Sequence, residues 1–280
     1  MANYLSTEKK VQVLNALCEG NSIRSIVRML DVHKTTILRI LNEVSKLARE
    51  VLDREVVNLK CRYVQCDEIW CYVAKKQKNC TRIEKQIGEV GDQYIFVAMD
   101  SETKLVISHI VGKRTSENAA ALMRDLNYRI PKIFQLSTDQ FFGYKEAVSN
   151  TFGIDIDFAT IHKHYSEDVI SEKRYSPAKI TGVTLRVLSG FPQQNKISTS
   201  HIERQNLTMR MCIRRLTRLT NAFSKKLDNL KSAIAIHFFY YNFIRIHQTL
   251  RITPAMQAGI TRKLWNWKDL LYLQSNVKVA

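Results

Sequence analysis

The chain has 280 residues and a net charge of +17, and its composition is 45% hydrophobic and 25% charged, with only 9 Gly and 4 Pro. This composition excludes a disordered or collagen-like chain, and no apolar run reaches the roughly 18 residues that a membrane span needs. The surplus of 43 Lys and Arg over 26 Asp and Glu favours a polyanionic partner, most commonly nucleic acid, over a merely basic protein.

The N-terminus and the cysteines indicate the compartment. Residues 1–10 contain no apolar stretch of the kind found in signal peptides, so we expect a soluble cytoplasmic protein. The 6 cysteines include no Cys-x-x-Cys pair and are expected to be reduced and mostly buried. A zinc site built from Cys61, Cys66, Cys71 and Cys80 is a weaker alternative, because their spacing does not match a zinc knuckle.

Residues 1–56 are predicted to form an all-α helix-turn-helix domain. Helices are expected over 6–18, 22–30 and 34–50, with Gly20 ending the first of them. Two short helices, a tight turn and a longer helix are typical of DNA-binding domains in which the last helix meets the bases. The candidate DNA contacts on that helix are Lys34, Thr35, Thr36 and Arg39. The alternative is an ordinary three-helix bundle used for dimerisation.

Residues 57–222 change to a pattern rich in β-branched and aromatic residues, which predicts a mixed sheet. The expected strands are 63–73, 93–99, 104–111, 132–138 and 154–159, and the expected helices between them are 115–129 and 142–150. Three strands joined by hairpins and then two helix–strand units give the chain order of a ribonuclease-H-like sheet. Residues 75–91 are expected to be a polar loop and residues 161–199 an irregular insertion.

The rest of the chain is predicted to be helical. One long helix is expected over 199–221, and a second over 223–246 opens a C-terminal helical region that spans 223–280. The predicted fold class is therefore α+β or α/β. An N-terminal helix-turn-helix domain precedes a ribonuclease-H-like mixed-sheet domain, and C-terminal helices follow.

Three acidic residues occupy positions that suggest chemistry. Asp67 interrupts an apolar strand, Asp139 follows the fourth strand, and Glu203 lies in the first turn of the long helix. In a ribonuclease-H-like sheet these acids converge, and converging carboxylates need a divalent cation such as Mg²⁺ or Mn²⁺. Taken singly, Asp67 is also explained by a polar partner in the core and Asp139 by capping of the next helix.

A row of basic residues follows the last acid. On the predicted helix, Arg210, Arg214 and Arg218 share the face of Glu203, and Arg204 lies beside it. A guanidinium holds a phosphate through two parallel hydrogen bonds, so these arginines are candidate DNA contacts. A solvated basic face is the alternative.

The sequence around each acid is distinctive. The stretches are Gln65–Trp70, Thr138–Asp139 and Ser198–Thr208. They resemble the acid motifs of DDE transposases, most closely those of the IS1-like insertion-sequence family. The resemblance continues through Arg214–Lys226, Tyr241–Leu250 and Thr253–Met256, and it extends over essentially residues 6–270.

This resemblance implies a catalytic domain in which Asp67, Asp139 and Glu203 hold Mg²⁺ or Mn²⁺, as two ions. It implies binding of double-stranded DNA at terminal inverted repeats, followed by strand cleavage and strand transfer into target DNA. Arg210 matches a basic position that contacts the terminal DNA. Because two element ends must be held together, at least a homodimer is expected. The alternatives are a non-catalytic, domesticated helix-turn-helix protein and a metal-dependent nuclease without strand transfer.

Overall fold

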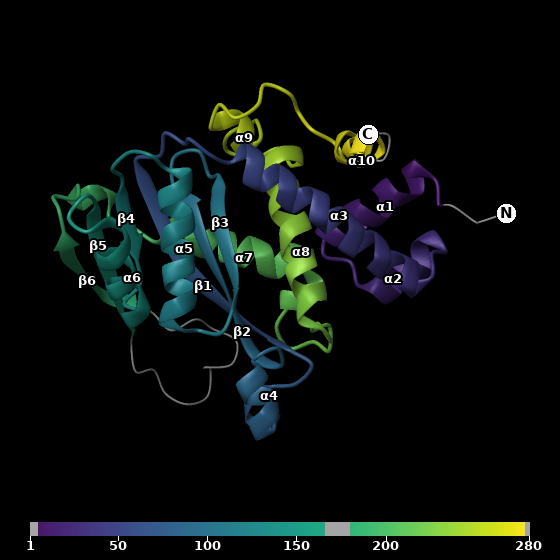
Figure 1. The fold of residues 1–280 in the computed structure, drawn as a ribbon, viewed down its shortest axis with the longest axis horizontal. Helices are drawn as coiled ribbons and strands as arrows, with labels where there is room; N and C mark the ends of the chain where they lie inside the picture. The colour runs from purple at the N-terminus through teal and green to yellow at the C-terminus, as the bar shows by residue number, and fades with distance from the viewer. Residues whose placement is uncertain (1–4, 166–179, 278–280) are drawn as a thin grey trace.

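The computed structural model describes residues 5–165 and 180–277 (Figure 1). The strands are β1 (Tyr63–Val73), β2 (Gly91–Asp100), β3 (Val106–Gly112), β4 (Gln135–Thr138), β5 (Asp157–Tyr165) and β6 (Ile180–Ser189). The α-helices are α1 (Thr7–Cys18), α2 (Ile23–Leu30), α3 (Lys34–Glu55), α4 (Arg82–Ile87), α5 (Ser116–Arg129), α6 (Phe142–Phe152), α7 (Ser200–Cys212), α8 (Leu227–Phe239), α9 (Pro254–Gln257) and α10 (Trp267–Val277). None of the helices in these described stretches combines the length and apolarity that a membrane crossing requires.

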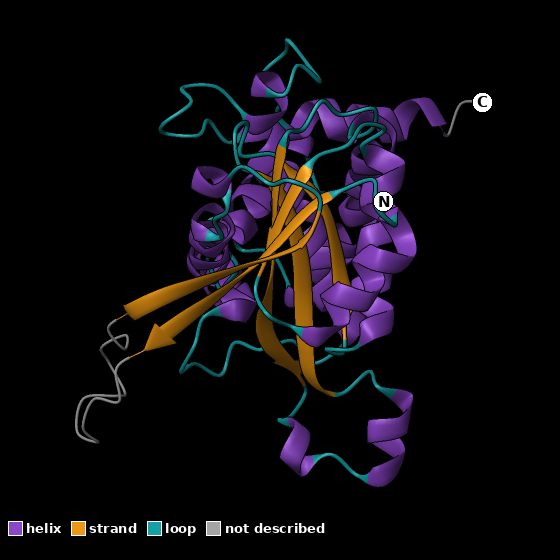
Figure 2. Cartoon of the chain, turned by 90° about the vertical axis from the view of Figure 1, so that its left-hand side faces the viewer, coloured by secondary structure: helices purple, strands orange, loops and turns teal. Residues whose placement is uncertain are grey.

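The strands form one mixed sheet of six in the order β3-β2-β1-β4-β5-β6. β1 is parallel to β4 and β4 is parallel to β5, whereas β2, β3 and β6 run antiparallel to their neighbours. Helices α5 and α6 cover one face of the sheet, and α7 lies against the other (Figure 1). β5 and β6 extend beyond the other strands as a two-stranded ribbon (Figure 2). This arrangement confirms the predicted mixture of a sheet with helices.

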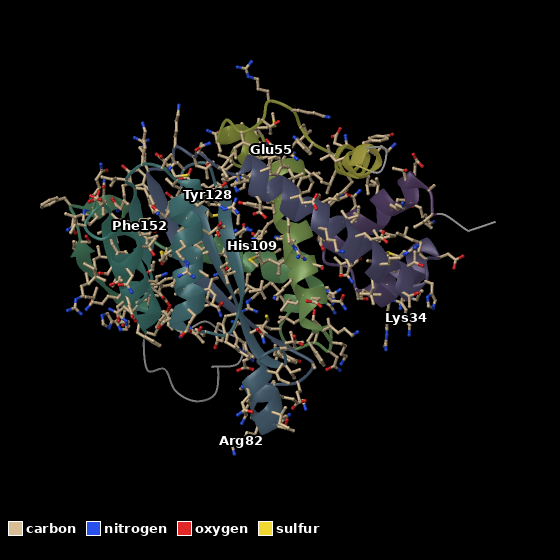
Figure 3. The ribbon with its side chains drawn as sticks, in the orientation of Figure 1. Lys34, Glu55, Arg82, His109, Tyr128 and Phe152 are labelled. Atoms are coloured by element: carbon tan, nitrogen blue, oxygen red, sulfur yellow. The ribbon has the colours of Figure 1, made fainter. Side chains whose placement is uncertain are left out.

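The N-terminal helices share a core with the rest of the chain. Figure 3 labels Lys34 and Glu55 at the two ends of α3, which reaches from the outer helices to the edge of the sheet. The buried side of α3 packs against α8, where the Ser45 hydroxyl donates a hydrogen bond of 3.0 Å to Ser232. Arg129 of α5 donates to two carbonyl oxygens at the C-terminal end of α3. One apolar core therefore continues from α1 to α10.

Most of the predicted elements are confirmed. Helices α1 and α2 and the start of α3 lie where they are expected, and α3 continues to Glu55. Apart from α4 between β1 and β2, the order β-β-β-α-β-α-β holds through β5. The strand predicted over 63–73 has these bounds in the structure, because its β-branched and aromatic residues suit a central strand covered on both faces. The DNA-reading role of the N-terminal helices stays a prediction.

The prediction of an irregular segment over 161–199 is wrong for residues 161–165 and 180–189. β5 continues to Tyr165, and Ile180–Ser189 pairs with it as the antiparallel strand β6. The apolar side chains of β6 are largely exposed, so hydrogen bonding to β5 stabilises this strand more than burial does. The alternation of apolar and polar residues in β6 was a usable strand signal. Residues 166–179 of the predicted insertion lie outside the described residues.

The prediction of one helix over 199–221 is also wrong, because α7 ends at Cys212. The Thr217 hydroxyl donates to the carbonyl oxygen of Arg210 (3.2 Å), which belongs to the last turn of α7. The Arg210 guanidinium donates in return to the carbonyl oxygen of Leu216 (3.1 Å). These two bonds turn the chain back on the helix end and replace further helical hydrogen bonds.

Two other segments differ from the prediction, the helix expected over 223–246 and the loop expected over 75–91. The helix expected over 223–246 begins only at Leu227, because Ser224 pairs with the end of β1 and its carbonyl oxygen accepts from Ala74 (2.8 Å). After Phe239 this helix widens into a π-helical turn. The predicted loop over 75–91 contains α4, which a Thr-x-x-Glu capping box begins.

Candidate active site

Asp67 lies where β1 extends past the end of β4. The parallel pairing of the two strands ends at Cys66 and Thr138, so the next residues, Asp67 and Asp139, lie together at the carboxyl end of β4. The side-chain amide of Asn206 donates to one Asp67 oxygen (2.8 Å), and the next backbone N–H donates to the other (2.8 Å). These two bonds fix the orientation of the Asp67 carboxylate.

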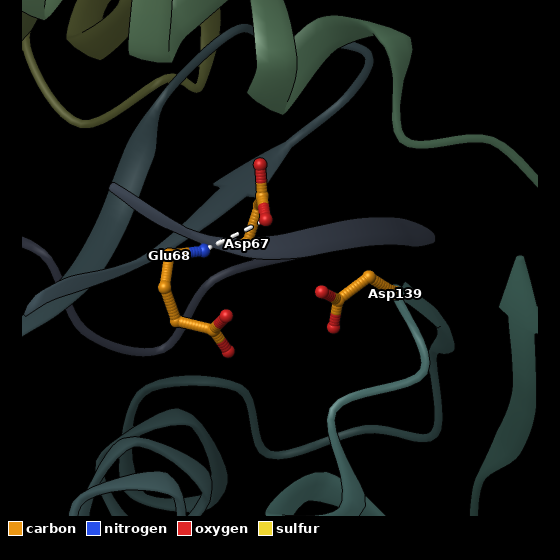
Figure 4. A group of neighbouring side chains, drawn as sticks. All are labelled: Asp67, Glu68 and Asp139. Atoms are coloured by element: carbon orange, nitrogen blue, oxygen red, sulfur yellow. Dashed lines mark hydrogen bonds between the residues drawn. The ribbon is translucent and has the colours of Figure 1, made fainter. Parts of the chain in front are cut away.

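Asp139 faces two other acids (Figure 4). One carboxylate oxygen each of Asp67, Glu68 and Asp139 lies within 4.8 Å of the others. Asp67 and Glu68 project from opposite sides of β1, as strand neighbours do, and Asp139 reaches both because it lies beyond the end of its own strand. The backbone N–H of Phe141 donates to Asp139 (2.9 Å) and holds the carboxylate in place.

Glu68 is a site residue that the sequence prediction missed. Its side chain is only 2% exposed, and one oxygen accepts from Arg114 (3.2 Å), whose guanidinium also contacts Asp139 (3.4 Å). The other oxygen, Oε1, is buried, and the buried hydroxyl of Tyr144 is the neighbouring polar group. Arg114 itself lies over the ring of Phe141, at 4.4 Å from the centroid. The sequence signal for Glu68 was its place next to Asp67.

Glu203 lies on another wall of the same site. Its side chain is 44% exposed, accepts from the Thr199 hydroxyl (2.7 Å) and pairs with Lys163 of β5. A cavity of about 680 Å³ is lined by Glu203 together with Asp67 and Asp139. The structure therefore brings all three predicted acids to one cavity, but the acid in closest contact with the aspartates is Glu68.

The site makes ionisation of the acids costly. Burial raises the pKa of Asp67 from 3.8 to about 7, and the negative charges of Asp139 and Glu203 add to this effect. Burial and the charge of Asp139 raise the pKa of Glu68 to about 7 as well. Carboxylates in this state gain most from a cation that neutralises them, and an all-oxygen donor set suits Mg²⁺ or Mn²⁺.

The predicted DNA contacts differ in their exposure. On α3, Lys34, Thr35 and Arg39 are exposed and Thr36 is half-buried. Near α7, Arg204 and Arg218 are exposed, and Arg210 and Arg214 are half-buried. Because α7 ends at Cys212, the predicted helical row from Glu203 through Arg218 does not form.

Arg210 makes two contacts inside the chain. Its guanidinium donates to the carbonyl oxygens of Leu216 (3.1 Å) and Trp70 (3.3 Å). Burial, and to a smaller extent the charge of Arg218, lowers its pKa to about 10. These contacts join the end of α7 to β1 and give the side chain a structural role in addition to the predicted contact with DNA phosphate.

We expect Arg210→Ala to lower the free energy of unfolding by about 1–3 kcal/mol, because two charge-assisted hydrogen bonds are lost. Urea denaturation measures this change, and Arg204→Ala, which truncates an exposed arginine of the same helix, is the matched control. The salt dependence of DNA binding tests the predicted phosphate contact separately. A slope that falls by about one supports that contact. An unchanged stability would contradict the structural role.

Comparisons with known proteins assign no family to this chain. No family model and no curated protein matches the sequence. Among solved structures, a Mos1 transposase paired-end complex with the left transposon end is 13% identical with a TM-score of 0.23, over 55% of this chain and 58% of that chain. A pre-cleavage Mos1 transpososome is 13% identical with a TM-score of 0.20, over 56% of this chain and 61% of that one. The matches thus span less than two thirds of either Mos1 chain.

A third structure matches a larger share of both chains. It is a piggyBac transposase synaptic complex with hairpin DNA, 12% identical with a TM-score of 0.40, over 96% of this chain and 70% of that chain. At these identities and scores, the function of this protein has to be argued from its own site.

Proposed function

We propose that this protein is a DDE transposase. It binds the terminal inverted repeats of an insertion sequence and catalyses metal-dependent DNA strand cleavage and strand transfer. The observation that carries the proposal is the meeting of Asp67, Asp139 and Glu203, which are far apart in the sequence, in one cavity at the carboxyl end of β4. The net charge of +17 supports a DNA substrate.

The donor set fits divalent cations. Asp67, Asp139 and Glu203 would hold two Mg²⁺ or Mn²⁺ ions, and Glu68, which lies beside the two aspartates, offers a further ligand. Such ions activate an attacking oxygen and stabilise the leaving oxygen of a phosphoryl transfer.

The surrounding residues position the acids. Asn206 orients Asp67, and Thr199 orients Glu203 through its hydroxyl. Two basic residues also reach the cavity, since Arg114 contacts Asp139 and Lys163 pairs with Glu203. Both supply positive charge beside the acids, where the phosphates of a DNA substrate would lie.

DNA recognition is assigned to the N-terminal helices. In this proposal Lys34, Thr35, Thr36 and Arg39 of α3 contact the terminal repeat. Arg204, Arg210, Arg214 and Arg218 contact the DNA backbone, and the protein acts as a homodimer or larger oligomer that holds two ends.

Incubation with labelled DNA from both flanks of the coding sequence and a target plasmid, with Mg²⁺ or Mn²⁺, tests the proposal. We expect nicked or cut ends, and ends joined to target DNA, resolved by strand on denaturing gels. Cleavage without joining would instead indicate a metal-dependent nuclease. Specific binding with neither cleavage nor joining, in either metal, would indicate a non-catalytic DNA-binding protein.

Recognition by α3 gives a separate prediction. In the full chain, Thr36→Ala or Arg39→Ala should reduce the ratio of affinities for end DNA and random DNA, because each lost base contact costs about 1–3 kcal/mol. Fluorescence anisotropy measures both affinities. Lys46→Ala removes an exposed charge farther along α3 and should leave the ratio unchanged. Equal ratios for all these variants and the original chain would contradict recognition through α3.

A further inference from the structure

A second cavity, which we call the junction cavity, lies between the N-terminal helices and the segment that joins α7 to α8. Its volume is about 740 Å³, and its walls come from α1, α2, α3, α8 and residues 213–225. Its lining includes Arg24 of α2, Asn229 near the start of α8, and Lys34, which Figure 3 labels at the start of α3. The cavity therefore adjoins the start of α3, where DNA contacts are proposed.

The lining of the junction cavity carries charge of only one sign. Five basic residues line it, namely Arg24, Lys34, Arg214, Arg215 and Lys225, and no acidic residue is found among its described lining residues. In the described part of the chain, none of the five takes part in an ion pair. Like charges held around one cavity repel each other, and an anion in the cavity would relieve this repulsion.

Arg215 supplies the second observation. Its Nη2 atom is buried and donates to no acceptor among the described residues, although a guanidinium in this setting ordinarily has its donors satisfied. Burial lowers the pKa of Arg215 to about 10, because no negative charge compensates the loss of water. Arg215 therefore adds an uncompensated positive charge to the lining of the junction cavity.

The remaining walls indicate what kind of anion fits. The lining also includes the apolar residues Leu38, Leu41 and Ile213, which a compact inorganic anion would not contact favourably. The wall residue Phe223 packs against Tyr72, with ring centroids 4.7 Å apart, and carries Lys225 Nζ at 3.9 Å from its own centroid. Several cations beside apolar and aromatic surface match a strand of phosphates, sugars and bases.

We propose that the junction cavity binds the phosphate backbone of one DNA strand between α3 and the catalytic domain. This inference rests on the proposed function, which identifies the ligand as DNA. Along α7, Glu203 and Cys212 are roughly 13 Å apart at 1.5 Å per residue, and the lining residues of the junction cavity begin directly after Cys212. The junction cavity therefore begins on the order of four base steps from Glu203, at 3.4 Å per step.

The first test measures DNA binding by the full chain in EDTA, with fluorescein-labelled duplex over a series of KCl concentrations. The double variant Arg214→Gln/Lys225→Gln should lower the slope of log affinity against log salt by about two, or about 0.9 for each lost phosphate contact. The matched control, Arg82→Gln/Lys85→Gln, removes two exposed charges of α4 and should keep the original slope (Figure 3 labels Arg82). Equal slopes for both double variants would overturn the proposal.

Arg215→Met separates a ligand contact from a structural role. Removing an unpaired buried charge should raise the melting temperature of the DNA-free protein, whereas the affinity for DNA should fall several-fold at low salt. A lower melting temperature together with unchanged DNA affinity would mean that Arg215 only supports the fold, and would overturn its assigned role.

A further measurement separates the two possible sources of phosphate. Inorganic phosphate at millimolar concentration should not raise the melting temperature as much as a short oligonucleotide does. Phosphate could instead raise the melting temperature of the original chain as much as the oligonucleotide does, and fail to raise that of Arg214→Gln/Lys225→Gln. The cavity then binds free phosphate and the DNA assignment fails. The proposed catalytic function is tested independently, because all of these measurements are made without metal. If the original chain cleaves DNA and Arg214→Gln/Lys225→Gln leaves the salt slope unchanged, the proposal about the cavity fails and the proposed catalytic function stands.

Discussion

Replacing Asp67 or Asp139 by Asn, or Glu203 by Gln, is expected to abolish DNA cleavage and joining while leaving the affinity for end DNA nearly unchanged. Each substitution keeps the shape of the side chain and removes a charge that would bind a metal ion. Loss of roughly 4 kcal/mol of transition-state stabilisation corresponds to about a thousandfold lower rate. Strand-resolved cleavage assays measure the rate, and anisotropy measures binding in the same preparations.

Asp155→Asn is the matched control, because it removes an exposed carboxylate that does not line the active-site cavity. Near-normal joining by any one of the three acid variants would remove that residue from the catalytic set. Glu68→Gln belongs in the same series. A loss as large as that of Glu203→Gln would make Glu68 a fourth ligand of the metal site, whereas normal activity would leave it a buried neighbour.

Asp67→Asn is expected to stabilise the metal-free protein at pH 8 by up to about 4 kcal/mol. The folded-state pKa of Asp67 is about 7, against 3.8 for an ordinary aspartate. Well below pH 3.8 the carboxyl group is protonated in both states and contributes nothing. As the pH rises from 4 to 7, the unfolded chain releases a proton that the folded chain retains, so the folded state loses stability. The amide of Asn has no such proton.

Urea denaturation between pH 4 and pH 8, in EDTA, measures this difference. The gap between Asp67→Asn and the original chain should open as the pH rises, whereas Asp155→Asn should follow the original chain throughout. A gap that closes with rising pH would contradict the raised pKa. Added Mg²⁺ should then raise the melting temperature of the original chain at pH 8 and barely affect Asp67→Asn, because binding to the folded state alone stabilises it.

The sequence by itself determined the elements that local pattern controls. The alternation of β-branched and aromatic residues located β1, and the helix signals located α1, α2 and the start of α3. It also singled out Asp67 and Asp139, because a carboxylate within an apolar strand and one just past a strand end are both unusual. Chain order then predicted a ribonuclease-H-like sheet in which these acids converge, and the pairing of β1 with β4 brings Asp67 and Asp139 together.

Local pattern did not predict where α7 ends. Apolar residues continue to recur at helical spacing past Cys212. The helix nevertheless stops there, because the side chains of Arg210 and Thr217 donate hydrogen bonds to backbone carbonyl groups across the turn. Those bonds depend on where β1 passes, since Arg210 also donates to Trp70. A hydrogen bond between distant segments leaves no periodic signal in the sequence.

Only the tertiary structure brought Glu68 into the active site. Neighbours on a strand point to opposite faces, so the place of Glu68 next to Asp67 in the sequence does not by itself bring the two carboxylates together. Asp139 lies beyond the end of β4, and from there its carboxylate approaches both Asp67 and Glu68. The junction cavity likewise collects cations from α2, α3 and the segment after α7. Residues this far apart in the chain meet only through packing of the shared core, which no local sequence pattern encodes.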